Sequence, residues 1–193
     1  MRNYTRYIPN GITMFRLLGA GCLACTVPFS PDFYGVYTFC GITDVLDGLT
    51  ARALHAESEL GSKLDSIGDL LFYSVAGILL LPYLTAHLPA LIWCCVGIIL
   101  MIRLASYGLA AFRYHRFASL HTWGNKLTGA ALFSFPYLVQ WVSVKTAGGL
   151  VAVIALASSA EELLIHMTSK NYDPGRKSLF GKRAEIGKKI DVK

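Results

Sequence analysis

Four aspartates stand at spacings that favour a metal site. Asp44 and Asp47 lie three positions apart, and Asp65 and Asp69 lie four positions apart a short way further along the chain. If both segments are helical, each pair shares one helix face, so two facing helices could gather four carboxylates around one point. All of them lie in or beside apolar stretches long enough to enter a membrane, where uncompensated anions are costly. The pattern therefore predicts that bound cations compensate these acids.

A site built from carboxylates favours hard cations, and these acids could hold two divalent ions, Mg²⁺ or Mn²⁺. Paired metals of this kind recur where a group is displaced at phosphorus. Gly48, Ala51 and Gly61 leave room beside the acids for a bulky group, which a phosphate ester needs and an ion path does not. Arg52 can offer a forked cation to a phosphate oxygen. We therefore favour phosphate chemistry over the alternative, a cation transporter.

The spacing resembles a known signature at every fixed position. The run Asp44-x2-Asp47-Gly48-x2-Ala51-Arg52-x8-Gly61-x3-Asp65-x3-Asp69 is similar to that of the CDP-alcohol phosphatidyltransferase family, and Pro9-Asn10-x2-Thr13-x2-Arg16 resembles the family's opening pattern. The resemblance implies a homodimeric membrane enzyme of six helices, with its metal site in a polar cavity facing the cytoplasm. It also implies transfer of a phosphatidyl group from CDP-diacylglycerol to a small alcohol, with release of CMP. A non-catalytic relative would be expected to have lost an acid, and none is missing.

The same resemblance implies roles for individual residues. Asp44, Asp47, Asp65 and Asp69 would hold the metals, and Asp69 would also take the proton from the acceptor hydroxyl. The residues expected at the nucleotide donor are Gly48, Ala51, Arg52, Ser58, Gly61, Asn10 and Thr13.

The acceptor alcohol stays open. Arg103 lies inside an apolar stretch, where an unpaired cation is costly and suggests function. The candidate contacts to an anionic acceptor are Arg103, Arg113, His121 and Lys126, to which Arg16 could add. Glycerol 3-phosphate is the first choice, serine the second and inositol phosphate the third. Alternatively, Arg16 and Arg103 could pair with the aspartates, and the loop cations could serve membrane topology alone.

The elements that must position these residues are membrane helices. Hydrophobic residues make up 54% of the chain and charged residues 16%, against roughly 25% charged in a soluble domain. Each candidate span has about the length that a bilayer core requires. The candidate spans are 11–29, 33–54, 62–84, 89–112, 127–144 and 148–168. The sequence thus predicts an all-α integral membrane protein with six transmembrane helices.

Charge predicts the orientation of that protein in the cell membrane. Lysines and arginines gather before the first span, after the second and fourth, and in the tail, whereas the opposite side has only Lys145. The positive-inside rule then puts both termini in the cytoplasm. We expect a single domain over residues 1–193, with 1–10 as a short interfacial helix and 170–193 as a basic tail. The basic charge is expected to meet anionic lipids and no nucleic acid.

Overall fold

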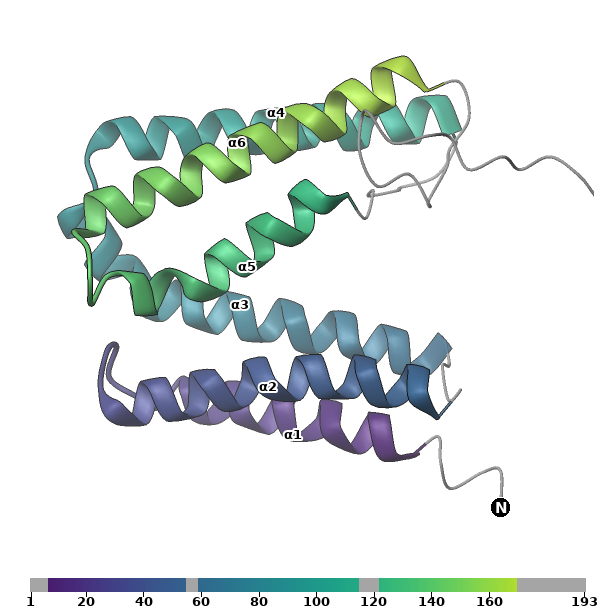
Figure 1. Cartoon of the computed structure of the whole chain (residues 1–193), viewed down its shortest axis with the longest axis vertical. Helices are drawn as coiled ribbons and strands as arrows, with labels where there is room; N and C mark the ends of the chain where they lie inside the picture. Colours follow the sequence, from purple (N-terminus) through teal and green to yellow (C-terminus); the bar gives the residue numbers. More distant parts are fainter. Residues whose placement is uncertain (1–6, 55–58, 115–121, 170–193) are drawn as a thin grey trace, which may run out of the picture. The chain divides into compact units, whose positions relative to one another are not determined.

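The regular structure of the described chain is entirely helical. The computed structural model describes residues 7–54, 59–114 and 122–169 (Figure 1). The helices are α1 (Tyr7–Leu23), α2 (Pro31–Ala53), α3 (Glu59–His87), α4 (Ala90–Tyr114), α5 (Trp123–Leu138) and α6 (Val144–Thr168). The predicted all-α class is confirmed for these residues.

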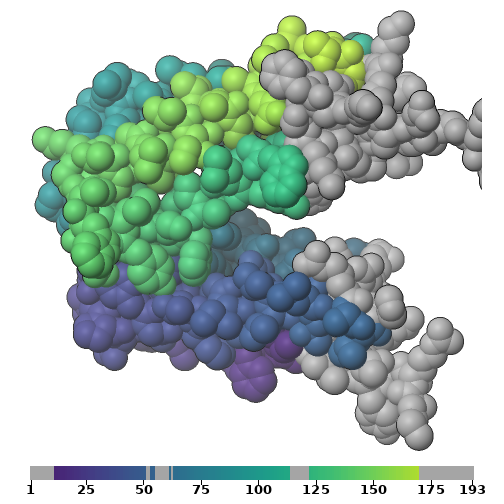
Figure 2. All heavy atoms as spheres, viewed as in Figure 1, coloured from purple at the N-terminus to yellow at the C-terminus, as the bar shows by residue number. Residues whose placement is uncertain are grey.

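The helices divide between two compact units, Met1–Ala86 and His87–Lys193. In the first unit, α1 packs along α2. In the second unit, α6 packs against both α4 and α5, and Figure 2 shows the green atoms of α5 beside the yellow-green atoms of α6. The single domain expected over residues 1–193 stays a prediction.

Within the part of the chain that the structure describes, three helices are long and apolar enough to cross a membrane. They contain the segments Lys63–His87, Ala90–Arg113 and Val144–Thr168. The apolar part of α1 is shorter, and α5 has 16 residues. Helix α2 has 23 residues, but its aspartates lower its mean hydropathy. The six predicted spans are therefore supported for α3, α4 and α6, and stay a prediction for the other three helices.

The first helix differs from its predicted limits of 11–29 at both ends. It begins at Tyr7, so that Pro9 lies in its first turn, where a missing backbone N–H removes no helical hydrogen bond. It ends at Leu23, and the chain then turns, with Phe29 at a φ of 64°. Residues 7–10 therefore belong to α1, and the interfacial role expected of residues 1–10 stays a prediction. The rest of the expected interfacial segment, 1–6, lies outside the described residues, as does the tail from 170.

The last two helices begin where a hydroxyl caps them. The Thr122 side chain accepts a hydrogen bond from the Asn125 N–H at 3.1 Å, and α5 begins at Trp123, ahead of the predicted 127. The Ser143 side chain likewise accepts from the Thr146 N–H at 3.1 Å, so α6 begins at Val144. The expected start at Gly148 was wrong. A helix begins more readily after a residue such as Ser143, whose side chain accepts a hydrogen bond from an otherwise unpaired N–H, than at a glycine, which has no side chain to do so.

Gly148 has a packing role inside α6. A Cβ atom there would lie 2.7 Å from Leu88 Cδ2 and 3.3 Å from Ile92 Cδ1, whereas a Cβ at Gly149 would meet nothing within 4 Å. We expect Gly148→Leu to lower the free energy of unfolding by about 1–3 kcal/mol through overpacking. The matched control is Gly149→Leu, and both are compared by unfolding in detergent micelles. Equal losses in the two variants would contradict this packing.

Candidate functional site

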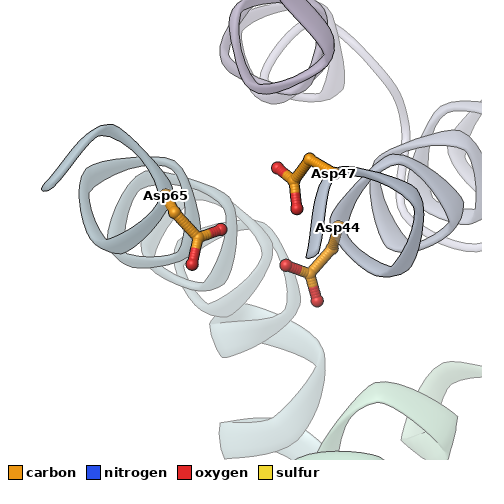
Figure 3. A group of neighbouring side chains, drawn as sticks. All are labelled: Asp44, Asp47 and Asp65. Atoms are coloured by element: carbon orange, nitrogen blue, oxygen red, sulfur yellow. The ribbon is translucent and has the colours of Figure 1, made fainter. Parts of the chain in front are cut away.

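Two helices of the first unit bring three of the four aspartates together. Asp44 and Asp47 lie one turn apart on α2, and Asp65 lies on α3. Figure 3 shows their carboxylates directed toward the space between these two helices. One oxygen from each of Asp44, Asp47 and Asp65 lies within 4.8 Å of the other two. The convergence expected from the helical spacing is confirmed for these three residues.

The fourth aspartate joins the others through an arginine of α1. Arg16 Nη1 forms ion pairs with Asp44 and, at 3.1 Å, with Asp69 Oδ1. Arg16 Nη2 lies 2.6 Å from Asp65 Oδ1 and 3.3 Å from Asp47 Oδ2. One guanidinium therefore contacts all four carboxylates. Of the two interpretations of Arg16, pairing with the aspartates is confirmed. We use the name aspartate cluster for the four acids together with this arginine: Asp44, Asp47, Asp65, Asp69 and Arg16.

The members of the aspartate cluster differ in exposure. Asp47 is 5% exposed and accepts a hydrogen bond from the Thr13 hydroxyl at 3.0 Å. By contrast, the side chains of Asp44 and Asp65 are 45% exposed and that of Asp69 is 43% exposed. Asp47 is thus held by a hydrogen bond from α1, while the other three carboxylates stay partly exposed to solvent.

The charge of the aspartate cluster is suited to hard cations. If all four acids are ionised, the one positive charge of Arg16, which contacts all four among the described residues, is outnumbered by four negative charges. The atoms that the aspartates offer as metal ligands are all carboxylate oxygens, the ligand type that Mg²⁺ and Mn²⁺ prefer. The residues present therefore fit one or two divalent ions, and Asp44, Asp47 and Asp65 offer ligand atoms closest together.

The residues expected at the nucleotide donor lie near this cluster in the chain. Gly48, Ala51 and Arg52 belong to the C-terminal part of α2, and Gly61 belongs to the first turn of α3. Asn10 lies in the first turn of α1. Thr13 donates its hydroxyl hydrogen to Asp47. Ser58 lies outside the described residues.

The residues expected at the acceptor belong to the second unit, and Arg103 has a partner that the sequence interpretation missed. Arg103 Nη2 donates to Asn125 Oδ1 at 3.0 Å, and Nη1 lies 3.7 Å from Glu162 Oε2. Asn125 Nδ2 donates to the same Glu162 oxygen at 3.0 Å, and Ser158 donates to Asn125 at 2.8 Å. The signal for Glu162 was present, because an ionisable residue in an apolar helix needs a partner.

The other acceptor candidates have separate surroundings. Arg113 Nη1 donates to the carbonyl oxygens of His166 and Met167 at 3.1 and 2.9 Å, and so caps the end of α6. Lys126 Nζ lies 5.2 Å from the centroid of the Trp123 ring. His121 lies outside the described residues. The structure thus gives Arg113 a structural role at the end of α6.

The Arg103–Glu162 pair is expected to stabilise the second unit. Glu162 is fully buried, so Arg103→Leu removes a cation from beside a buried acid and should cost about 1–3 kcal/mol of unfolding free energy. The double variant Arg103→Leu/Glu162→Leu should recover part of that loss, because no charge stays unpaired. Unfolding of both single variants and the double variant in micelles measures the coupling. Additive losses would show that the pair is not coupled.

One comparison with known proteins gave a match. A family model described as CDP-alcohol phosphatidyltransferase matches residues 6–165, a range that includes the aspartate cluster and the Arg103–Glu162 pair. No curated protein and no solved structure matched the chain.

Proposed function

The chain belongs to the CDP-alcohol phosphatidyltransferase family, and we propose that it transfers a phosphatidyl group from CDP-diacylglycerol to a small polar alcohol with release of CMP. The family and the three long apolar helices identify it as a membrane protein of phospholipid synthesis. A different CDP-linked donor is the alternative within the same reaction class.

The observation that carries this proposal is the convergence of acids from α2 and α3. Oxygens of Asp44, Asp47 and Asp65 lie within 4.8 Å of one another, and Asp69 shares their guanidinium partner. We propose that these four aspartates hold two Mg²⁺ or Mn²⁺ ions. When bound, such ions would neutralise the negative charge that builds on the pyrophosphate as CMP departs. The alternative of a cation transporter is disfavoured by the small residues Gly48, Ala51 and Gly61 at their fixed spacing from the acids, because an ion path does not need that room.

Asp69 is the proposed general base. In the transfer, the acceptor oxygen bonds to the phosphorus that carries diacylglycerol, and the bond from that phosphorus to the bridging oxygen breaks, so that CMP leaves with the electron pair. The proton of the acceptor hydroxyl passes to the Asp69 carboxylate. The side chain of Asp69 is 43% exposed, which supports contact with an incoming hydroxyl. Asp47, being buried and hydrogen-bonded to Thr13, is suited to hold a ligand and not to exchange protons.

The donor is proposed to bind beside the C-terminal part of α2. The support for this is the small size of Gly48 and Ala51 in α2 and of Gly61 at the start of α3, since small residues let a bulky group approach a helix backbone. Arg52 and Ser58 would contact its phosphates. Asn10 and Thr13 of α1 would complete the contacts, with Thr13 acting also as the residue that positions Asp47.

Glycerol 3-phosphate is the proposed acceptor, with serine and inositol phosphate as alternatives. Arg103 supports an anionic acceptor: its side chain is 25% exposed and its Nη1 lies 3.7 Å from Glu162 Oε2, so part of the guanidinium can meet an anion. Lys126 and His121 are proposed to assist it. Arg113 is the weakest candidate, because it already caps α6.

Dimerisation and orientation are further proposals. A homodimer is proposed from the family resemblance. Cytoplasmic termini in the cell membrane, with the basic tail at anionic lipids, are proposed from the charge asymmetry of the sequence.

A competition assay tests the proposed function. Purified protein in liposomes receives CDP-diacylglycerol, Mg²⁺ or Mn²⁺, and equal amounts of glycerol 3-phosphate, serine and inositol phosphate, and the labelled lipids are then separated. We expect CMP release together with one dominant product, phosphatidylglycerophosphate. No CMP release with any acceptor, accompanied by cation flux in the same liposomes, would favour the transporter instead.

A further inference from the structure

Arg16 stands among the carboxylates that are proposed to bind metal. Each terminal nitrogen of its guanidinium faces two aspartates, at distances between 2.6 and 3.3 Å for Asp47, Asp65 and Asp69, and Nη1 also pairs with Asp44. The side chain is fully buried. A divalent ion bound by these aspartates would use carboxylate oxygens of the same residues. The guanidinium and the ions therefore draw on one set of ligands.

Helix α3 provides the space that the guanidinium occupies. A Cβ atom at Gly68 would lie 2.9 Å from Arg16 Nε and 3.0 Å from Nη2, closer than side chains normally approach. Arg16 Nε is buried and has no hydrogen-bond partner among the described residues. An unsatisfied buried N–H costs free energy, so the contacts at the other two nitrogens must outweigh it. The contacts with the aspartates therefore hold the guanidinium in place. The absence of a side chain at Gly68 leaves the room that it occupies.

We propose that Arg16 is a built-in counter-cation of the aspartate cluster. In the metal-free protein it holds the four carboxylates together, and it yields part of these contacts when divalent ions bind. This inference rests on the proposed function, because it requires that the aspartates bind metal.

Two consequences follow, and they have opposite signs. Without Arg16, one buried and three half-buried carboxylates repel one another where solvent screens them weakly, so the metal-free protein becomes less stable. The same change removes a positive charge that opposes an incoming cation, so the affinity for metal rises. A residue that only shaped the site would lower both stability and affinity when replaced. The direction of the affinity change therefore separates the two roles.

The test compares the wild-type protein with Arg16→Gln and Arg16→Lys in micelles. Mn²⁺ binding is measured from the signal of free Mn²⁺ in electron paramagnetic resonance, and Tm is measured in EDTA and in saturating Mn²⁺. We expect Arg16→Gln to have a lower Tm in EDTA, a larger rise in Tm on adding Mn²⁺, and a Kd for Mn²⁺ lowered by about tenfold or more, in line with the effect of one close charge on a neighbouring ionic equilibrium. Arg16→Lys keeps the charge, and its Kd should stay near that of the wild type.

A second variant keeps the proposal testable if Arg16→Gln does not fold without metal. Gly68→Ala places a methyl group against Nε and should push the guanidinium away from the acids, so it too should strengthen Mn²⁺ binding. Its matched control is Gly77→Ala on the same helix, where a Cβ meets nothing within 4 Å and no change is expected. Weaker or unchanged Mn²⁺ binding in both Arg16→Gln and Gly68→Ala overturns the inference while leaving the proposed function intact. A wild-type protein that binds no Mn²⁺ and transfers no phosphatidyl group overturns both.

Discussion

Asparagine in place of Asp69 is expected to lower the rate of phosphatidyl transfer by about 10²- to 10⁴-fold, the usual contribution of a positioned general base. The amide cannot accept the proton of the acceptor hydroxyl, although it keeps the size of the aspartate side chain. Donor binding should be partly retained, because Asp44, Asp47 and Asp65 still offer oxygens within 4.8 Å of one another. The measurement is transfer to a labelled acceptor in liposomes, together with CDP-diacylglycerol binding by the same preparation.

The matched control for this substitution is Asp32→Asn. Asp32 is exposed in the first turn of the same helix that carries Asp44. At about 1.5 Å of rise per residue, it lies about 18 Å along that helix from Asp44. The Asp32→Asn substitution should therefore leave the transfer rate unchanged. Synthesis at the wild-type rate in Asp69→Asn would refute the base role, whereas loss of both transfer and donor binding would indicate that Asp69 acts mainly as a metal ligand.

Removal of metal is the second change with a large expected effect. The proposed ions supply several kcal/mol of stabilisation to the developing charge, which corresponds to roughly a 10³-fold loss of rate when they are absent. EDTA should therefore reduce transfer to near background, and Mn²⁺ or Mg²⁺ should restore it. EDTA already saturated with Mg²⁺ serves as the control and should have no effect. Transfer that persists in EDTA would contradict the metal centre.

Asp47→Asn tests the same centre from the protein side. This carboxylate is buried and held by Thr13 and Arg16, so an asparagine fills the same space while the negative charge is lost. The Mn²⁺ concentration needed for half-maximal transfer should rise, and transfer at a limiting metal concentration should fall by roughly the same 10³-fold. An unchanged metal dependence would show that Asp47 is not a ligand.

The two units treat buried charge differently. In the first, four carboxylates share one guanidinium, which leaves capacity for further cations. In the second, Glu162 and Arg103 balance each other through Asn125. Because unpaired charge is expensive in an apolar environment, the excess of acids over Arg16 in the first unit supports the proposal that metal binds there. The contacts among Arg103, Asn125 and Glu162 in the second unit are explained by stabilisation, and contact of Arg103 with an acceptor stays a proposal.

Helix identity and the faces that carry the acids could be predicted from sequence because both depend on local spacing. Asp44 and Asp47 share a face on any helix, whatever packs against it. Exact helix limits were less accessible: the capping hydroxyls of Thr122 and Ser143 moved the starts of α5 and α6. The number of membrane spans could be predicted from sequence only in part, because the aspartates of α2 lower the mean hydropathy of that helix.

Residue types and spacing by themselves determined which acids could meet, which helices are apolar and which reaction class fits. Only the tertiary structure decided which cation faces those acids, because the partner of a buried charge depends on which faces of distant helices come together. Arg16 had two open interpretations until α1, α2 and α3 were placed, and Arg103 acquired Glu162 as its partner only when α6 packed against α4. Local periodicity determines on which face of its helix a side chain lies, whereas packing between helices determines which residues that side chain contacts.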